Sequence, residues 1–192
     1  LTNFIHLDAD FGTIGGGGAN YIDLGNSYGT IAGGEGALIS GDHGTVAGGK
    51  RNEAGEGAFV GGGGVSAALG MHGNVALARS SAIVSGIDNY IDPLNNPNSF
   101  IGAGENNQIN DDHNQGYVSD NVIGGGDGNV ISSAWTSVIG GGYNNVIELA
   151  SDRYIDNAVI GGGRNNYIED SYGSTIGGGI FNSIEDATGG DD

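Results

Sequence analysis

The chain contains 192 residues, including 42 glycines and no cysteine, and only 7% of its residues are aromatic. Five basic residues stand against 23 acidic ones, and the resulting formal net charge of −18 argues against nucleic acid or an anionic membrane as a partner. The lack of cysteine excludes a disulfide framework. The sequence contains no run of about 18 apolar residues, so no membrane-spanning helix is predicted. Because the chain starts with leucine rather than methionine, we expect a processed protein or a fragment of a longer one.

Glycine at this level is typical of disordered or collagen-like chains. Neither class fits, because the glycines show no strict three-residue period and fall in register with isoleucines. Apolar residues at fixed offsets instead indicate a folded internal repeat.

Residues 1–10 precede the first repeat. Within them the stretch Phe4-Ile5-His6-Leu7 predicts a short entry strand. Terminal repeats of a stack are usually atypical, so we expect this segment to act as a cap.

Residues 11–186 consist of copies of one unit, which is clearest from Ser137 to Ile147. Each copy is anchored on an isoleucine or valine, and the ten anchors are Ile14, Ile31, Val46, Val60, Ile83, Ile101, Ile123, Ile139, Ile160 and Ile176. A glycine follows every anchor at the third position: Gly17, Gly34, Gly49, Gly63, Gly86, Gly104, Gly126, Gly142, Gly163 and Gly179. A polar tail, residues 187–192, ends the chain.

Two further columns complete the unit. Six residues after the anchor, eight copies carry asparagine (Asn20, Asn52, Asn89, Asn107, Asn129, Asn145, Asn166 and Asn182), whereas Ala37 and Ser66 are the exceptions. Eight residues after the anchor an apolar residue returns: Ile22, Ile39, Ala54, Ala68, Ile91, Ile109, Ile131, Ile147, Ile168 and Ile184.

These offsets stay fixed while the distance between anchors varies from 14 to 23 residues. A rigid unit with linkers of variable length is typical of the coils of a solenoid. We therefore predict an all-β parallel β-solenoid of about ten coils, forming a rod of roughly 48 Å if coils are about 4.8 Å apart.

Each unit is predicted to fold as strand, turn and strand. β-forming residues precede the anchors, and the glycine of the turn allows a positive φ angle. The asparagine amide is expected to bond to nearby backbone and to the asparagines of neighbouring coils. A helix is disfavoured, because each glycine would cost roughly 1 kcal/mol relative to alanine.

The longer linkers are where we expect recognition, since loops on a rigid scaffold can vary. The linker 69–82 is long enough to hold an additional partial coil around Val75. The loops 92–100, 110–120 and 148–157 are irregular and polar. Candidate contacts for a sugar or a protein are Tyr117, Trp135, Arg153 and Tyr154, with an exposed or packing role as the alternative for each.

The residue before the anchor predicts an oligomer. This column reads Thr13, Thr30, Thr45, Phe59, Ala82, Phe100, Val122, Val138, Val159 and Thr175. Because side chains alternate along a strand, this residue and the anchor cannot face the same core. Apolar residues on both faces are typical of strands buried on both sides, so we expect another copy of the chain to cover the second face. The alternative is an exposed mixed column.

One column of acidic residues suggests a metal-binding site. The residue after the returning isoleucine is acidic in five copies, namely Asp23, Asp92, Glu148, Glu169 and Glu185. Carboxylates stacked about 4.8 Å apart repel one another unless a cation or water screens them, and calcium prefers such oxygen ligands. The alternative is a solvated acidic edge that discourages aggregation. A rise in melting temperature on calcium addition would distinguish them.

No catalytic motif is found in the sequence. The four-glycine runs at residues 15–18 and 61–64 lack the Gly-Lys-Ser/Thr of a phosphate-binding loop, and there is no Gly-x-Ser-x-Gly. The histidines lack zinc spacing. Solenoid tailspikes carry paired carboxylates on coil faces, which invites comparison with Asp111, Asp112, Asp152 and Asp156, but the sequence does not give their separations. We expect no enzymatic activity and no cofactor other than calcium.

The consensus small-Val-Ile-Gly-Gly-Gly-x-x-Asn-x-Ile, seen at residues 137–147 and 121–131, resembles the head repeats of trimeric autotransporter adhesins such as the YadA head, and related repeats in phage tail fibres. The resemblance spans residues 11–186. It implies a trimer of left-handed parallel β-rolls that serves as an extracellular or virion-borne attachment device. The longer linkers, the Gly-Gly pairs and the lack of a heptad stalk and membrane-anchor barrel depart from the adhesin pattern, so a head or fibre segment is expected.

The sequence thus favours a structural or adhesive segment of an extracellular or virion fibre that binds a host surface or cell-surface glycan through loops between coils. Two alternatives are a subunit of a self-assembling extracellular filament and a polysaccharide-depolymerising tailspike domain. An ice-binding solenoid would need a continuous threonine array, whereas only four of the ten residues before the anchors are threonine.

Overall fold

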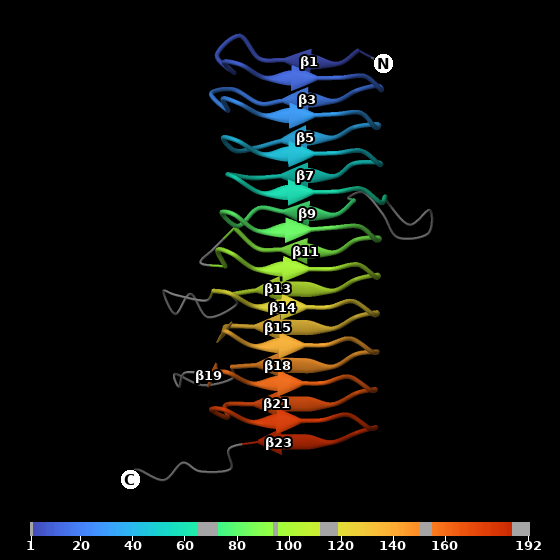
Figure 1. Ribbon diagram of the computed structural model, residues 1–192, viewed down its shortest axis with the longest axis vertical. Coiled ribbons are helices and arrows are strands. Elements are labelled where there is room, and N and C mark those ends of the chain that lie inside the picture. Colours follow the sequence, from blue (N-terminus) through green and yellow to red (C-terminus); the bar gives the residue numbers. More distant parts are fainter. Residues whose placement is uncertain (1, 65–72, 94–95, 112–118, 150–154, 186–192) are drawn as a thin grey trace.

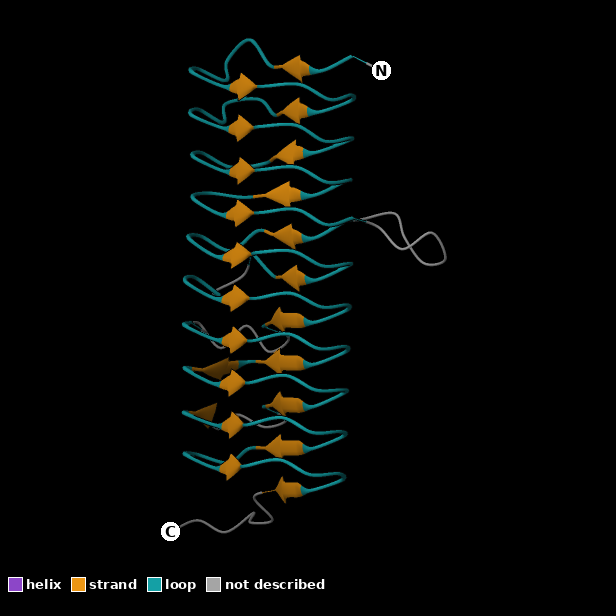
Figure 2. Ribbon diagram, turned by 45° about the vertical axis from the view of Figure 1, so that its right-hand side comes forward, coloured by secondary structure: helices purple, strands orange, loops and turns teal. Residues whose placement is uncertain are grey.

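The computed structural model describes residues 2–64, 73–93, 96–111, 119–149 and 155–185. Every regular element within these ranges is a short β-strand. The chain winds as a stack of coils, with the strands forming two parallel columns along the long axis (Figures 1 and 2). The predicted all-β parallel β-solenoid is confirmed.

The strands that carry the anchors form one ten-stranded sheet, here called the anchor sheet. Its strands, in order, are β2 (Thr13–Ile14), β4 (Thr30–Ile31), β6 (Thr45–Val46), β8 (Phe59–Val60), β10 (Ala82–Ile83), β12 (Phe100–Ile101), β14 (Val122–Ile123), β17 (Val138–Ile139), β20 (Val159–Ile160) and β22 (Thr175–Ile176).

The returning strands form an eleven-stranded sheet, here called the return sheet. Its strands are β1 (Phe4–Ile5), β3 (Tyr21–Ile22), β5 (Leu38–Ile39), β7 (Glu53–Ala54), β9 (Val75–Ala76), β11 (Tyr90–Ile91), β13 (Gln108–Asn110), β15 (Val130–Ser132), β18 (Val146–Glu148), β21 (Tyr167–Glu169) and β23 (Ser183–Glu185). The segment expected as an entry strand supplies β1, which pairs with β3. A separate pair joins β16 (Ala134–Trp135) to β19 (Ile155–Asp156).

The predicted register of the repeat is confirmed. Anchors of successive coils are direct partners, as Ile123 is to Ile139, and so are returning residues, as Ile131 is to Ile147. The side chains of these four isoleucines are fully buried. The core is therefore a narrow seam between the two sheets, built from one inward side chain of each sheet per coil together with small residues such as Ala58 and Ala158.

The fourth coil differs from the prediction. Its returning residue is Ala76, which lies between Ala54 and Ile91 in the return sheet, and not Ala68. The asparagine of that coil is Asn74 rather than an exception at Ser66. Val75 thus belongs to the fourth coil and not to an additional partial coil. The insertion lies between the glycine turn and the returning strand, and Ser66 and Ala68 fall outside the described residues.

Glycine at the third position of the turn is required by the backbone. All ten of these glycines have positive φ angles, for example 88° at Gly49 and 102° at Gly142. A Cβ atom at Gly142 would lie 2.2 Å from the carbonyl oxygen of Gly163 in the next coil. The glycine column therefore lets consecutive turns approach to a distance that no other residue permits.

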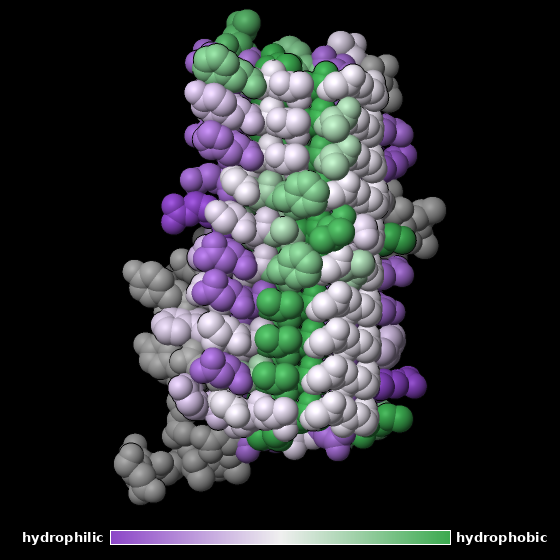
Figure 3. All heavy atoms as spheres, in the orientation of Figure 1, coloured by the Kyte–Doolittle hydropathy of each residue, from purple (hydrophilic) through white to green (hydrophobic). Residues whose placement is uncertain are grey.

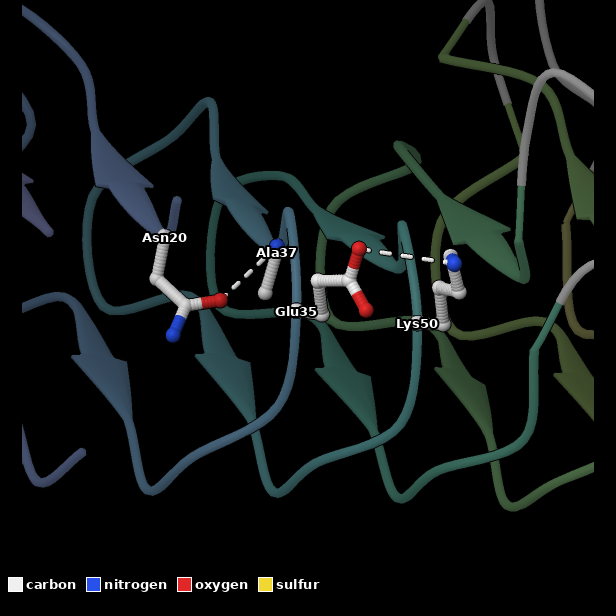
Figure 4. A network of polar contacts seen from close by, with 4 residues as sticks. All are labelled: Asn20, Glu35, Ala37 and Lys50. Carbon is white, nitrogen blue, oxygen red and sulfur yellow. Dashed lines mark hydrogen bonds and ion pairs between the residues drawn. The ribbon is translucent and has the colours of Figure 1, made fainter. Parts of the chain in front are cut away.

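The buried asparagines form a continuous ladder from the fourth coil onward. In Asn129, Nδ2 donates to Oδ1 of Asn107 at 3.0 Å and to the carbonyl oxygen of Gly142 at 3.1 Å. Its Oδ1 accepts the backbone N–H and the side-chain N–H of Asn145. Ala37 interrupts the column nearer the N-terminus, where Oδ1 of Asn20 still accepts the N–H of Ala37 (Figure 4). This ladder satisfies backbone groups that the turn would otherwise bury without a partner.

A second left-handed column, absent from the sequence prediction, lies three residues before each anchor. Its φ angles range from 46° at Thr136 to 64° at Gly173, and the column is Phe11, Tyr28, His43, Gly57, Ser80, Asn98, Asp120, Thr136, Asn157 and Gly173. Strand N–H groups donate to the following coil, whereas the members of this column from Tyr28 to Asn157 donate to the preceding one, as His43 does to Ser27. The positive φ angle therefore reverses the direction of the backbone hydrogen bond at this edge.

Candidate functional surfaces

The outer face of the anchor sheet carries an exposed apolar column. The side chains of Val122, Val138 and Val159 are half-buried, while Phe59 and Phe100 are 40% and 36% exposed. Figure 3 shows a vertical line of apolar side chains on the molecular surface, beside columns of near-neutral hydropathy. In the single chain this column is thus open to solvent.

Side-chain-free glycines flank the apolar column. A Cβ atom placed on Gly61 would lie 3.2 Å from Cε1 of Phe59, and one on Gly102 would lie 3.5 Å from Cε1 of Phe100. Each ring therefore lies against a glycine of its own coil rather than projecting fully into solvent. The face thus has an apolar centre bordered by glycines.

The acidic column lies on the outer face of the return sheet, and the members nearest the C-terminus lie directly above one another on successive strands. Glu148, Glu169 and Glu185 are direct register partners on three successive strands, with Ser132 completing the column above them. Asp23 and Asp92 follow β3 and β11, so they belong to distant coils and do not join this group. No group of three or more histidine, cysteine or acidic side chains suited to a metal ion is found within the described ranges.

Tyr167 lies between two of the stacked carboxylates. Its hydroxyl donates to Oε1 of Glu148 at 2.5 Å. Burial raises the pKa of Tyr167 above its ordinary value, and the hydrogen bond to Glu148 and the negative charges of Glu148 and Glu169 raise the pKa further. The phenol remains a neutral donor in the folded chain, which relieves part of the repulsion between the two carboxylates.

This arrangement predicts a loss of stability in alkali. The folded state holds the Tyr167 proton more tightly than the unfolded state, whose pKa stays near 10.0. The stabilisation is therefore complete below about pH 10 and falls as the pH rises above that value, because the unfolded chain then loses the proton first. We expect urea midpoints to fall less between pH 9 and pH 11.5 in Tyr167→Phe than in the natural chain. Equal falls of the urea midpoint in the two proteins would contradict the role given to Tyr167, since every other tyrosine is present in both.

The loop candidates from the sequence are only partly placed. Tyr117, Arg153 and Tyr154 lie outside the described residues. Trp135 lies on β16, where it is half-buried, pairs with Asp156 of β19, and accepts the N–H of Asn157 on its carbonyl oxygen. Its backbone is thus held by the small two-stranded sheet at the loop-bearing edge.

Of the carboxylates compared with tailspike sites, only Asp111 has a described side chain. It is 6% exposed, and its Oδ1 accepts a hydrogen bond from Oγ of Ser133 at 3.2 Å. Asp112 and Asp152 lie outside the described residues, and Asp156 contributes only its backbone to β19. Within the described part of the chain these residues define no carboxylate pair.

The structure brings together three rings that the sequence pattern did not predict. Phe11 and Tyr28 stack with ring centroids 5.0 Å apart, and Tyr28 and His43 stack at 4.8 Å. Phe11 is 74% exposed and Tyr28 52% exposed, and His43 is exposed as well. These residues, here called the aromatic ladder, stand three positions before Ile14, Ile31 and Val46. Aligning the residues upstream of the anchors puts these three in one column, but the stacking of their rings follows only from the winding of the chain.

The opposite edge, which carries the glycine turns, is mixed in charge. Lys50 and Glu35 of adjacent coils form an ion pair at 3.4 Å (Figure 4). Arg164 lies over the ring of Tyr143, 5.3 Å from its centroid. Both side chains of the ion pair are about half exposed, so the pair contributes little stability, typically less than about 1 kcal/mol.

The described residues contain no helix long and apolar enough to cross a membrane. Comparison with models of known protein families gives no match to this chain. Comparison with curated protein sequences likewise gives no significant relative. Function must therefore be argued from the repeat and from the surfaces described above.

Proposed function

We propose that this chain is a structural and adhesive segment of an extracellular or virion fibre, in which copies associate through the outer face of the anchor sheet. The supporting observation is the exposed apolar column centred on Val122, Val138 and Val159 with its flanking glycines. Parallel sheets are normally covered on both faces, and burying this column would give the anchor sheet its second covered face.

A trimer is the assembly we propose, in keeping with the resemblance of the repeat to adhesin heads and tail-fibre repeats. The glycines beside the column carry no side chain that would hold neighbouring backbones apart. The anchor strands themselves contain no charged residue, and the described acidic residues lie on the return sheet and on the edges of the coils, so charge does not oppose contact at the centre of this face.

Solution mass tests the proposal. Light scattering of the purified chain is expected to give three times the monomer mass of 19.1 kDa. Val138→Glu should dissociate the assembly, because it places an unpaired charge in the centre of the interface. Val130→Glu is the matched control, since Val130 occupies the equivalent half-buried position on the return sheet, on strand β15. A monomeric natural chain, or equal dissociation by both variants, would contradict the proposal.

A further inference from the structure

The aromatic ladder continues along the coil edge to a position without a side chain. Phe11, Tyr28 and His43 have φ angles of 59°, 61° and 59°, and Gly57 has 62°. The N–H of Gly57 donates to Asp42 as the N–H of His43 donates to Ser27. Gly57 is therefore the fourth position of the same column, one coil beyond His43, and is here called the open rung.

The ladder residues are unusual for the conformation they adopt. Left-handed φ angles favour glycine, asparagine and aspartate, and bulky side chains there are strained. The same column uses Asn98, Asp120 and Asn157 in later coils. Three exposed rings in strained positions gain little from burial, and strained residues of this kind concentrate at functional sites.

The open rung has room for one ring. The three atoms nearest to a Cβ atom on Gly57 would all belong to Ser80 of the next coil, with Oγ the nearest at 3.5 Å. Because coils are about 4.8 Å apart, His43 and Ser80 are separated by roughly two coil spacings. One ring can therefore stack on the free face of the imidazole, at the spacing already seen between Tyr28 and His43.

The residues around the open rung favour a neutral ring that carries hydroxyl groups. Ser80 supplies a hydroxyl at the open rung, and the acidic residues Asp42 and Glu56 stand next to His43 and Gly57 in the chain, with Oδ1 of Asp42 accepting the N–H of Ser27. Hydroxyl and carboxylate oxygens suit a ring that carries hydroxyl groups. The chain's net charge of −18 disfavours anionic ligands. The flat C–H face of a pyranose ring matches an aromatic face, while its hydroxyl groups match the hydroxyl and carboxylate oxygens.

We propose that the aromatic ladder and the open rung form a saccharide-binding site, in which one neutral pyranose ring stacks on His43 above Gly57. This inference rests on the proposed adhesive function and assigns that function a ligand class and a place. The site lies on the coil edge that also carries Trp135, three positions before the anchors and not at the outward-facing positions of the anchor strands.

Saturation-transfer NMR and calorimetry with the full chain test the site. The probes are neutral oligomers of glucose, mannose, galactose and N-acetylglucosamine, with benzyltrimethylammonium as a cationic ring ligand for comparison. At least one neutral oligosaccharide is expected to bind. Gly57→Tyr should weaken that binding about tenfold or more, because a fourth ring fills the open rung, and Tyr28 already shows that tyrosine fits this conformation.

Two further variants control for indirect effects of the substitutions on saccharide binding. Gly173→Tyr adds a tyrosine at the same type of position, φ 64°, with nothing near its Cβ, and should leave binding unchanged. His43→Asn removes the stacking ring but keeps a residue that the column accepts at Asn98 and Asn157, and should weaken binding as Gly57→Tyr does. Circular dichroism melting checks that each variant folds.

The site would be refuted if no neutral oligosaccharide bound, if only the cationic probe bound, or if His43→Asn bound sugar as the natural chain does. Equal losses in Gly57→Tyr and Gly173→Tyr would refute it as well. Saccharide binding that survives His43→Asn would leave the adhesive function standing with its site elsewhere. A monomeric chain that still binds sugar at the open rung would instead overturn only the assembly.

Discussion

Replacing Gly49 with alanine is expected to lower the free energy of unfolding by roughly 3 to 5 kcal/mol, combining left-handed backbone strain with overpacking. Gly49 has a φ angle of 88°, and a Cβ atom there would lie 2.1 Å from the carbonyl oxygen of Gly63 and 2.6 Å from Nδ2 of Asn52. The contact is with backbone of the next coil, which cannot move without separating the stack. Chemical denaturation followed by circular dichroism measures the change.

The neighbouring glycine provides the control. A Cβ atom on Gly48 would have nothing within 4 Å, Gly48 has no positive φ angle, and other coils carry Ser85 and Ala103 at the same place. Gly48→Ala should therefore change stability by less than about 0.5 kcal/mol. Similar losses in both variants would mean that glycine content, and not the turn geometry, maintains the coil.

Replacing Asn129 with leucine is expected to cost a comparable amount, roughly 3 to 5 kcal/mol, because several buried partners lose their hydrogen bonds at once. The side chain is fully buried and bonds to Asn107, Gly125 and Gly142, and Oδ1 accepts two N–H groups of Asn145. Leucine fills a similar volume but satisfies none of these groups. The loss should appear as a lower urea midpoint with an unchanged denaturant slope.

Asn182 serves as the matched control for the ladder. It is exposed at the last described coil, and its side chain donates only to Asn166 and Gly178. Asn182→Leu should cost about 1 kcal/mol or less, because water can reach the groups it leaves. If Asn129→Leu proved as mild as Asn182→Leu, the ladder would be a consequence of the stacking and not one of its causes.

These two columns explain how a chain so rich in glycine holds one register. Isoleucine alone would not prevent a slip between coils, because each coil offers nearly the same apolar side chains. The glycine turn fits only against another glycine turn, and each asparagine amide bonds both to its own coil and to its neighbours. Register is thus set by steric fit and polar pairing at the turn.

The same local rules made the fold predictable from the sequence. The fixed offsets of glycine, asparagine and isoleucine each correspond to one physical requirement: a positive φ angle, a buried amide and an inward apolar side chain. The pairing of Ile123 with Ile139 follows from them directly. The exposed column on the anchor sheet was also predictable, because side chains alternate along a strand.

The sequence could not place the insertion of the fourth coil. Residues near Ala68 and the segment Asn74-Val75-Ala76 both offer small or apolar residues after the glycine turn. Pairing with β7 and β11 selects the second segment, whose Asn74 joins the amide ladder through Asn52 and Asn89. That choice depends on contacts with coils above and below, which no local window contains.

The sequence by itself determined the coil, because each requirement of the turn is met by residues within about eleven positions of one another. Only the tertiary structure decided what the coil edge presents. No single residue type marks the left-handed column before the anchors, and Phe11, Tyr28 and His43 are separated by 17 and 15 residues. Winding brings them to a spacing near 5 Å, since every coil returns the chain to the same edge one strand spacing further along the axis.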